Sequence, residues 1–160
     1  MILARGGAWR RAKAEAEAHA LATLEKREFV PFRAHPGAAS LMTAHVVYPA
    51  LDPGVPGTFS RRIVGDWLRG ELGFRGVIVS DDLEMGAIAA LCPIGEAGIL
   101  AAAAGHDLLL VCHDLNAQKE VYYKLLEAYE SKRLPLKELE ESGERIRRLK
   151  LKRKNRFTGG

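Results

Sequence analysis

Apolar residues occur in two contrasting patterns along the chain, in short continuous runs and at helical spacing. Continuous runs predict buried strands at 77–80 and 107–112, and a third, shorter strand is expected at 39–44. Helical spacing or helix-favouring composition predicts helices at 12–28, 61–72, 94–104, 116–130 and 135–150. Strands that alternate with helices in this way indicate parallel strands joined by right-handed crossovers. The chain is therefore expected to have an α/β fold.

Local signals refine several of these helices. Ser60 is a suitable N-cap for the helix at 61–72, and Gly73 supplies its C-terminal stop. The alanine-rich first helix has little apolar surface to bury. On the helix at 116–130 we expect one apolar face, which is formed by Tyr122, Leu125, Leu126 and Tyr129.

The overall composition is that of an ordinary globular protein, with 48% apolar and 28% charged residues. A net charge of +4 does not by itself indicate nucleic-acid binding. The basic run at 145–156 could bind an acidic surface, but a solvated helix end with cations at the negative pole of its dipole explains the run more simply. No apolar run is long enough to cross a membrane. We therefore expect neither a nucleic-acid partner nor a membrane partner.

The first residues and the cysteines bear on location and redox state. The stretch at 1–26 has no apolar core like that of a signal peptide, so the expected location is cytoplasmic. Cys92 and Cys112 are far apart in the sequence and show no metal-type pairing. Their spacing favours reduced thiols and leaves one disulfide open.

The most informative segment joins a buried strand to two carboxylates. The apolar run at 77–80 is followed directly by Asp81 and Asp82. A parallel strand that delivers acidic residues to its C-terminal end is the arrangement of a (β/α) barrel active site. The alternative is that one of the two carboxylates caps the next helix. A complete (β/α)8 barrel needs about 250 residues and eight strands, so three strands cannot close one alone.

Several segments of the chain resemble glycoside hydrolase family 3, and within it the bacterial β-N-acetylglucosaminidases. Gly73 to Met85, which contains Ser-Asp-Asp-Leu-Glu-Met, is similar to the nucleophile segment of that family. Upstream segments agree with it in order and spacing at 30–33, 41–52 and 58–60. The resemblance implies an α/β fold that is the C-terminal portion of a TIM-type (β/α)8 barrel, about three βα units long and incomplete as a closed barrel.

The same resemblance implies roles for the residues around this strand end. Asp81 corresponds to the catalytic nucleophile, and Asp82 is expected to cap or brace the following turn. Glu84 is expected to be a solvated surface residue. Met85 matches the family pattern and implies packing beneath the sugar, with plain core filling as an equal alternative. His45, at the end of a strand, is expected to support the substrate site rather than to act in catalysis.

The other histidines carry weaker expectations. His113 occupies a strand end like that of His45, and its role is left open. His19, His35 and His106 are expected to be surface or turn residues. No two histidines have the spacing of zinc ligands, so we expect no metal and no cofactor.

A retaining glycosidase also needs an acid/base group. The resemblance implies a histidine in a Lys-His-x-Pro-Gly-His loop, and no such pattern occurs in the sequence. The resemblance divides the chain into three parts: an Ala/Arg-rich segment at 1–23 that departs from the family, a barrel part at 24–150 and a basic tail at 151–160.

The function implied is that of a β-N-acetylhexosaminidase that removes terminal N-acetylglucosamine from glycans, such as peptidoglycan fragments during recycling. Because the acid/base loop is missing, we expect the isolated chain to be inactive. The alternative is a non-catalytic half-barrel that associates with itself or with a complementing chain through exposed barrel edges.

Overall fold

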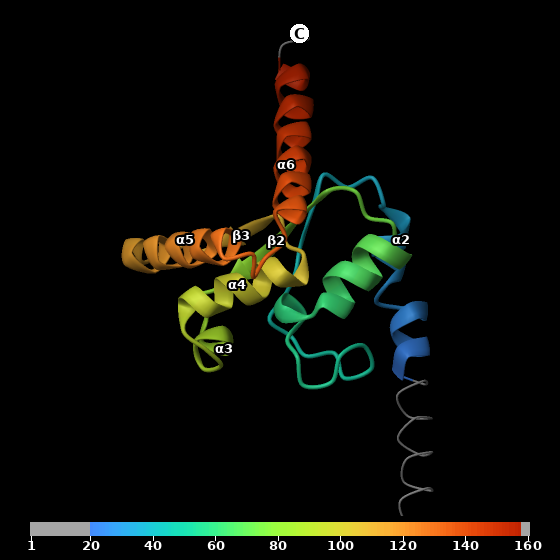
Figure 1. The fold of residues 1–160 in the computed structure, drawn as a ribbon. Coiled ribbons are helices and arrows are strands. Elements are labelled where there is room, and N and C mark those ends of the chain that lie inside the picture. Colours follow the sequence, from blue (N-terminus) through green and yellow to red (C-terminus); the bar gives the residue numbers. More distant parts are fainter. Residues whose placement is uncertain (1–19, 158–160) are drawn as a thin grey trace, which may run out of the picture.

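The computed structural model describes residues 20–157, and for 153–157 it describes the backbone alone. The segment at 1–19, with His19 and most of the stretch at 1–23, lies outside the described residues, as does 158–160. The order of elements is shown in Figure 1: a helix at 20–26, α2 (Val30–Ala34), β1 (Ser40–Met42), η1 (Gly57–Phe59), η2 (Arg62–Glu71), β2 (Val77–Asp82), α3 (Gly86–Ala89), α4 (Ile94–Ala104), β3 (Leu108–Leu110), α5 (Leu115–Glu130) and α6 (Leu136–Phe157).

In the described part of the chain, three strands form one parallel sheet in the order β1-β2-β3. Helices connect successive strands, so the predicted α/β class and its parallel crossovers are confirmed. The sheet and its helices have the alternation expected for a portion of a (β/α) barrel, and the described residues contain too few strands to close one. The predicted strand at 77–80 extends to Asp82, and therefore the two carboxylates are its last residues rather than the residues after it.

The three strands differ in burial. The first half of β2 is buried, whereas β1 and β3 each pair on one side only. Leu108 is 38% exposed and Met42 is 56% exposed. The prediction of a buried strand at 107–112 was therefore wrong in burial, because the run of leucines forms an edge of the sheet in this chain.

The main core lies between η2 and the sheet. Phe29, Trp67 and Phe74 are buried there, and the rings of Phe29 and Trp67 lie 3.9 Å apart between centroids. Leu21 and Leu24 of the helix at 20–26 pack against this cluster. The expectation that the first helix has little to bury was therefore wrong for its described part.

The ends of η2 follow the signals in the sequence. Ser60 Oγ accepts a hydrogen bond from the backbone N–H of Ile63 at 3.1 Å, which is an N-cap contact. η2 is a π-helix along its whole length, and the N–H of Leu72 continues this wide spacing by donating to the carbonyl of Trp67, five residues earlier, at 2.8 Å. Gly73 then takes φ = +66°, a left-handed conformation that stops the helix.

A second core joins α4 and α5. Ile99, Ala128 and Leu134 are buried in it. A side chain at Gly98 would begin 2.7 Å from Val121 Cγ1, so this glycine lets the two helices approach closely. The predicted apolar face of α5 was wrong in part, because Tyr122 and Leu126 are exposed while Val121 and Ala128 face α4.

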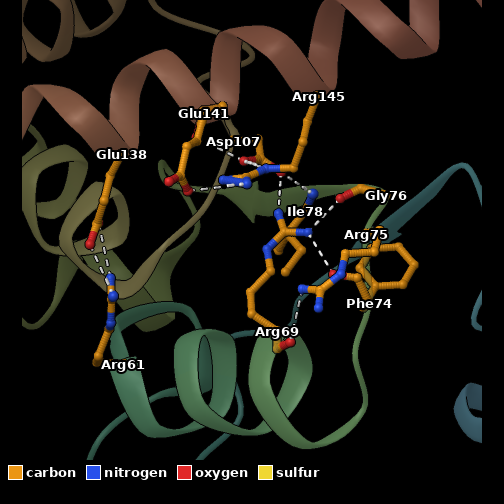
Figure 2. A network of polar contacts seen from close by, with 11 residues as sticks. Arg61, Arg69, Phe74, Arg75, Gly76, Ile78, Asp107, Glu138, Glu141 and Arg145 are labelled. Atoms are coloured by element: carbon orange, nitrogen blue, oxygen red, sulfur yellow. Dashed lines mark hydrogen bonds and ion pairs between the residues drawn. The ribbon is translucent and has the colours of Figure 1, made fainter.

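The amino-terminal end of the sheet holds a buried ion network around Asp107, which directly precedes β3 (Figure 2). The Asp107 side chain is fully buried and accepts hydrogen bonds from the side chains of Arg69, Arg145 and Ser142. The backbone N–H of Ile78 also donates to it, at 2.7 Å. The network therefore ties η2, β2, β3 and α6 together.

The last helix extends further than predicted. α6 runs to Phe157 instead of ending near residue 150, and Figure 1 shows it projecting away from the sheet. The basic run is therefore helical as far as 157, and Leu151 and Lys152 are exposed. Arg147 and Arg148 pair with Glu144 on the same helix. Among the described residues, no helix combines the length and the apolar character needed to span a membrane.

Candidate active site

Asp81 and Asp82 lie at the carboxyl end of β2, the central strand of the sheet. Both residues are partly buried, and the Asp82 side chain is only 13% exposed. Oδ1 of Asp81 accepts the backbone N–H of Asp82 at 2.8 Å. Among the residues that the structure describes, Oδ2 of Asp81 has no hydrogen-bond partner. Asp81 is thus held on one oxygen and free on the other, as an attacking carboxylate must be.

Asp82 braces the turn that follows, as expected. Its Oδ1 accepts the N–H of Glu84 at 3.1 Å and the N–H of Cys112 at 3.3 Å. The second bond links the end of β2 to the loop after β3. Asp82 therefore fixes the local backbone on which Asp81 stands.

His45 supports the same segment from the loop after β1. Its Nε2 lies 2.8 Å from the carbonyl oxygen of Asp82, and its Nδ1 lies 2.7 Å from Thr58 Oγ1. A carbonyl can only accept, so Nε2 carries the proton, and in the neutral ring Nδ1 accepts the Thr58 hydroxyl. Both ring nitrogens are occupied within the protein. His45 acts as a positioning residue for Asp82, and its contact with substrate stays a prediction.

Glu84 corrects an expectation. Its carboxylate accepts the backbone N–H groups of His113 and Asp114 at 2.6 and 2.9 Å. It is therefore a partly buried structural carboxylate rather than a solvated surface residue, because it satisfies the first donors of the loop that leads into α5. The sequence did not reveal this contact, since the residues are far apart along the chain.

Met85 is 46% exposed just before α3. The alternative of plain core filling is therefore wrong, whereas a contact with sugar stays a prediction.

His106 was expected at the surface, and that was wrong. It is buried, with Nε2 2.9 Å from Thr43 Oγ1 and Nδ1 3.0 Å from the carbonyl of Ala101. Burial lowers the pKa of His106 to about 4, so the ring is neutral near pH 7. His35 is exposed, as expected.

His113 completes the group of side chains at this end of the sheet. Its Nδ1 lies 3.1 Å from Asp82 Oδ2 and 3.6 Å from Glu84 Oε2. One ligand atom from each of the three residues lies within 4.8 Å of the others, a grouping that could hold a metal ion. Linear spacing missed this group because His113 reaches it from the loop after β3. The nearby Cys112 and the more distant Cys92 are both free thiols.

Comparison with known proteins places this geometry in context. Residues 11–149 match the model of the glycosyl hydrolase family 3 N terminal domain. A beta-hexosaminidase of Alkalilimnicola ehrlichii is 45% identical over 96 residues, which are 59% of this chain and 27% of that protein. A beta-hexosaminidase of Nitrosomonas eutropha is 41% identical over 104 residues, which are 64% of this chain and 30% of that protein.

Solved structures also resemble this chain, in agreement with the family match. A glycoside hydrolase family 3 beta-N-acetylglucosaminidase from Paenibacillus sp. str. FPU-7 superimposes with a TM-score of 0.79 at 41% identity. That match covers 82% of this chain and 26% of the Paenibacillus chain. The chain thus spans less than a third of the length of these three relatives.

Proposed function

Because the chain belongs to glycosyl hydrolase family 3, we propose that it is the nucleophile-bearing part of a retaining β-N-acetylhexosaminidase. The observation that carries the proposal is Asp81 at the carboxyl end of the central strand, with one carboxylate oxygen held and the other free. The carboxyl ends of the strands are where (β/α) barrels place their active sites. The names of the relatives support the hexosaminidase class.

The proposed reaction has two steps. The carboxylate of Asp81 attacks the anomeric carbon, a glycosyl ester forms, and the bond from that carbon to the leaving oxygen breaks. The leaving oxygen takes a proton from a general acid. Water then attacks the ester, gives up a proton, and releases the sugar with its original anomeric configuration and the free carboxylate of Asp81.

Of the histidines at this end of the sheet, His45 is not available for the proton transfer. His45 has both ring nitrogens engaged by Thr58 and Asp82. The acid/base loop that the family resemblance implies is absent from this sequence. We therefore propose that the isolated chain does not cleave unactivated glycosides.

The proposed substrates are glycans with terminal N-acetylglucosamine, such as peptidoglycan fragments, and the proposed setting is cytoplasmic recycling. Support for the sugar comes from the beta-N-acetylglucosaminidase structure that the chain resembles. Met85, half-exposed beside the strand end, is proposed to contact the sugar, and His45 to support that contact through Asp82.

An activated leaving group separates the nucleophile from the missing acid. The dinitrophenolate of a 2,4-dinitrophenyl β-N-acetylglucosaminide can leave without being protonated, whereas the methoxide of a methyl glycoside needs a proton to leave. We expect slow formation of an ester on Asp81 with the first compound and no reaction with the second. The ester should persist, because its hydrolysis needs a general base. Intact mass spectrometry and peptide mapping would detect it.

Matched variants make the experiment decisive. Asp81→Asn should abolish labelling, whereas Asp66→Asn, at an exposed carboxylate on η2, should retain it. Labelling at another residue would contradict the assignment of Asp81. Equal reaction with the methyl glycoside would contradict the absence of an acid.

The alternative is a non-catalytic half-barrel that associates through its sheet edges. The observation in its favour is the exposure of Met42 on β1 and Leu108 on β3, since unpaired edges are sites of strand addition. Sedimentation should then show association that Leu108→Lys weakens, with no label on Asp81. Labelling of a monomeric chain would exclude this alternative.

A further inference from the structure

We propose that Asp82, Glu84 and His113 form a binding site for a divalent zinc ion at the carboxyl end of β2 and β3. One ligand atom of each residue lies within 4.8 Å of the others. His113 Nδ1 is 3.1 Å from Asp82 Oδ2 and 3.6 Å from Glu84 Oε2. In a tetrahedral zinc site with bonds of about 2.1 Å, neighbouring ligand atoms are about 3.4 Å apart. The two observed separations are close to this value without any movement.

The carboxylates are held in place by the backbone. Asp82 receives the N–H groups of Glu84 and Cys112 on Oδ1, which leaves Oδ2 facing His113. Glu84 receives the N–H groups of His113 and Asp114. Such outer contacts orient metal ligands, and each carboxylate oxygen keeps a lone pair after accepting one bond. The ligand set is therefore organised before a metal arrives.

The charge at this end favours a cation. Asp81, Asp82 and Glu84 are three carboxylates in one short segment. In the described part of the chain no lysine or arginine forms an ion pair with them. His113, which pairs with Asp82 and Glu84, is charged only if protonated. A divalent ion would neutralise most of this charge while leaving the imidazole neutral, as a metal ligand must be.

The donors select the metal. One imidazole nitrogen with two carboxylate oxygens suits zinc, whereas calcium and magnesium prefer oxygen ligands throughout. The His113 side chain is 79% exposed, so an ion can enter from solvent and a water can fill the fourth position. Bound zinc would link the end of β2 to the loop after β3 and thereby stabilise the fold. This site does not depend on the role proposed for Asp81.

Calorimetric titration of the full chain with zinc chloride tests the proposal. We expect one zinc ion to bind, with at least tenfold weaker binding in His113→Gln and in Glu84→Gln. His35→Gln removes an exposed histidine elsewhere and should leave zinc binding unchanged. Zinc should also raise the unfolding temperature of the wild type and of the His35 variant, and not that of the other two.

Each result decides the matter. Zinc affinity within twofold of wild type in either ligand variant would overturn the site, as would failure of zinc to bind the wild-type chain. The unfolding transition of each variant without zinc shows whether it is folded. Two independent ligand variants keep the test valid if one of them fails to fold.

Discussion

Acidic side chains occupy both ends of the β sheet, and the two ends treat them in opposite ways. At the amino-terminal end Asp107 is fully buried and receives Arg69, Arg145, Ser142 and the backbone of Ile78 (Figure 2). At the carboxyl end Asp81 and its two acidic neighbours are partly exposed, and no described lysine or arginine pairs with them. At the amino-terminal end the buried carboxylate links several elements of the fold. At the carboxyl end the three carboxylates keep negative charge that no lysine or arginine of the described residues neutralises.

The difference shows how a barrel fragment separates stability from chemistry. A buried carboxylate with every lone pair used cannot attack a substrate, but its loss leaves buried cations unpaired. A carboxylate with a free oxygen contributes little to stability and can react. In (β/α) barrels the amino-terminal face serves stability and the carboxyl-terminal face serves catalysis. The role proposed for Asp81 would give the three strands of this chain the same polarity.

The largest loss of unfolding free energy is expected from breaking the buried ion network around Asp107. Asp107→Asn removes the charge between Arg69 and Arg145, whose side chains are mostly buried. Breaking a buried pair in this way should cost about 3–5 kcal/mol of unfolding free energy. Urea denaturation measures the loss, with Asp66→Asn as the exposed control. A cost below about 1 kcal/mol, as for surface ion pairs, would show that the network does not stabilise the fold.

The next largest effect is expected from lowering the pH, which should reduce the unfolding free energy through His106. The pKa of His106 falls from 6.5 to about 4 on folding because the ring is buried, so the unfolded chain binds its proton more tightly. Stability from this group is present above pH 6.5 and lost as the pH falls toward 4, by about 3 kcal/mol in total. His106→Gln should flatten this part of the stability profile. His35→Gln should leave it unchanged, and an unchanged profile in both variants would contradict the account.

A smaller loss of stability is expected at Asp82, which braces the turn at the carboxyl end of β2. Asp82→Asn keeps an oxygen for the N–H groups of Glu84 and Cys112 but loses the ion pair with His113. The expected cost is about 1 kcal/mol, since hydrogen-bond acceptance is retained. Thermal unfolding without added metal measures it. A cost equal to that of Asp107→Asn would erase the contrast between the two ends.

Local sequence signals predicted the positions of the helices and strands better than their burial by neighbouring elements. The apolar run before Asp81, the Ser60 cap and the Gly73 stop are all encoded within a few residues, and the structure confirms them. Burial at 107–112 could not be predicted the same way, because the strand lacks a neighbour on one side here. The extent of α6 was also missed, since its charged sequence has no stop signal at residue 150.

The site was predictable only along its own strand. The buried run predicted the position of Asp81 and Asp82 at a strand end, and the structure confirms that position and the bracing contact of Asp82. The catalytic role of Asp81 stays a prediction. The contacts of Glu84 with the loop after β3, and of His106 with Thr43, join residues far apart in sequence. No spacing rule reports such contacts, because strand register and crossovers create them.

The unfolding free energy of Asp81→Asn tests the central claim most directly. The account predicts a value within about 0.5 kcal/mol of wild type, or slightly higher, because the substitution removes one of three crowded negative charges and no fastening contact. The same measurement on Asp107→Asn gives the loss of unfolding free energy expected for a carboxylate that stabilises the fold. A loss at Asp81 comparable to that at Asp107 would contradict the account, since it would make Asp81 a structural residue rather than one kept available for reaction.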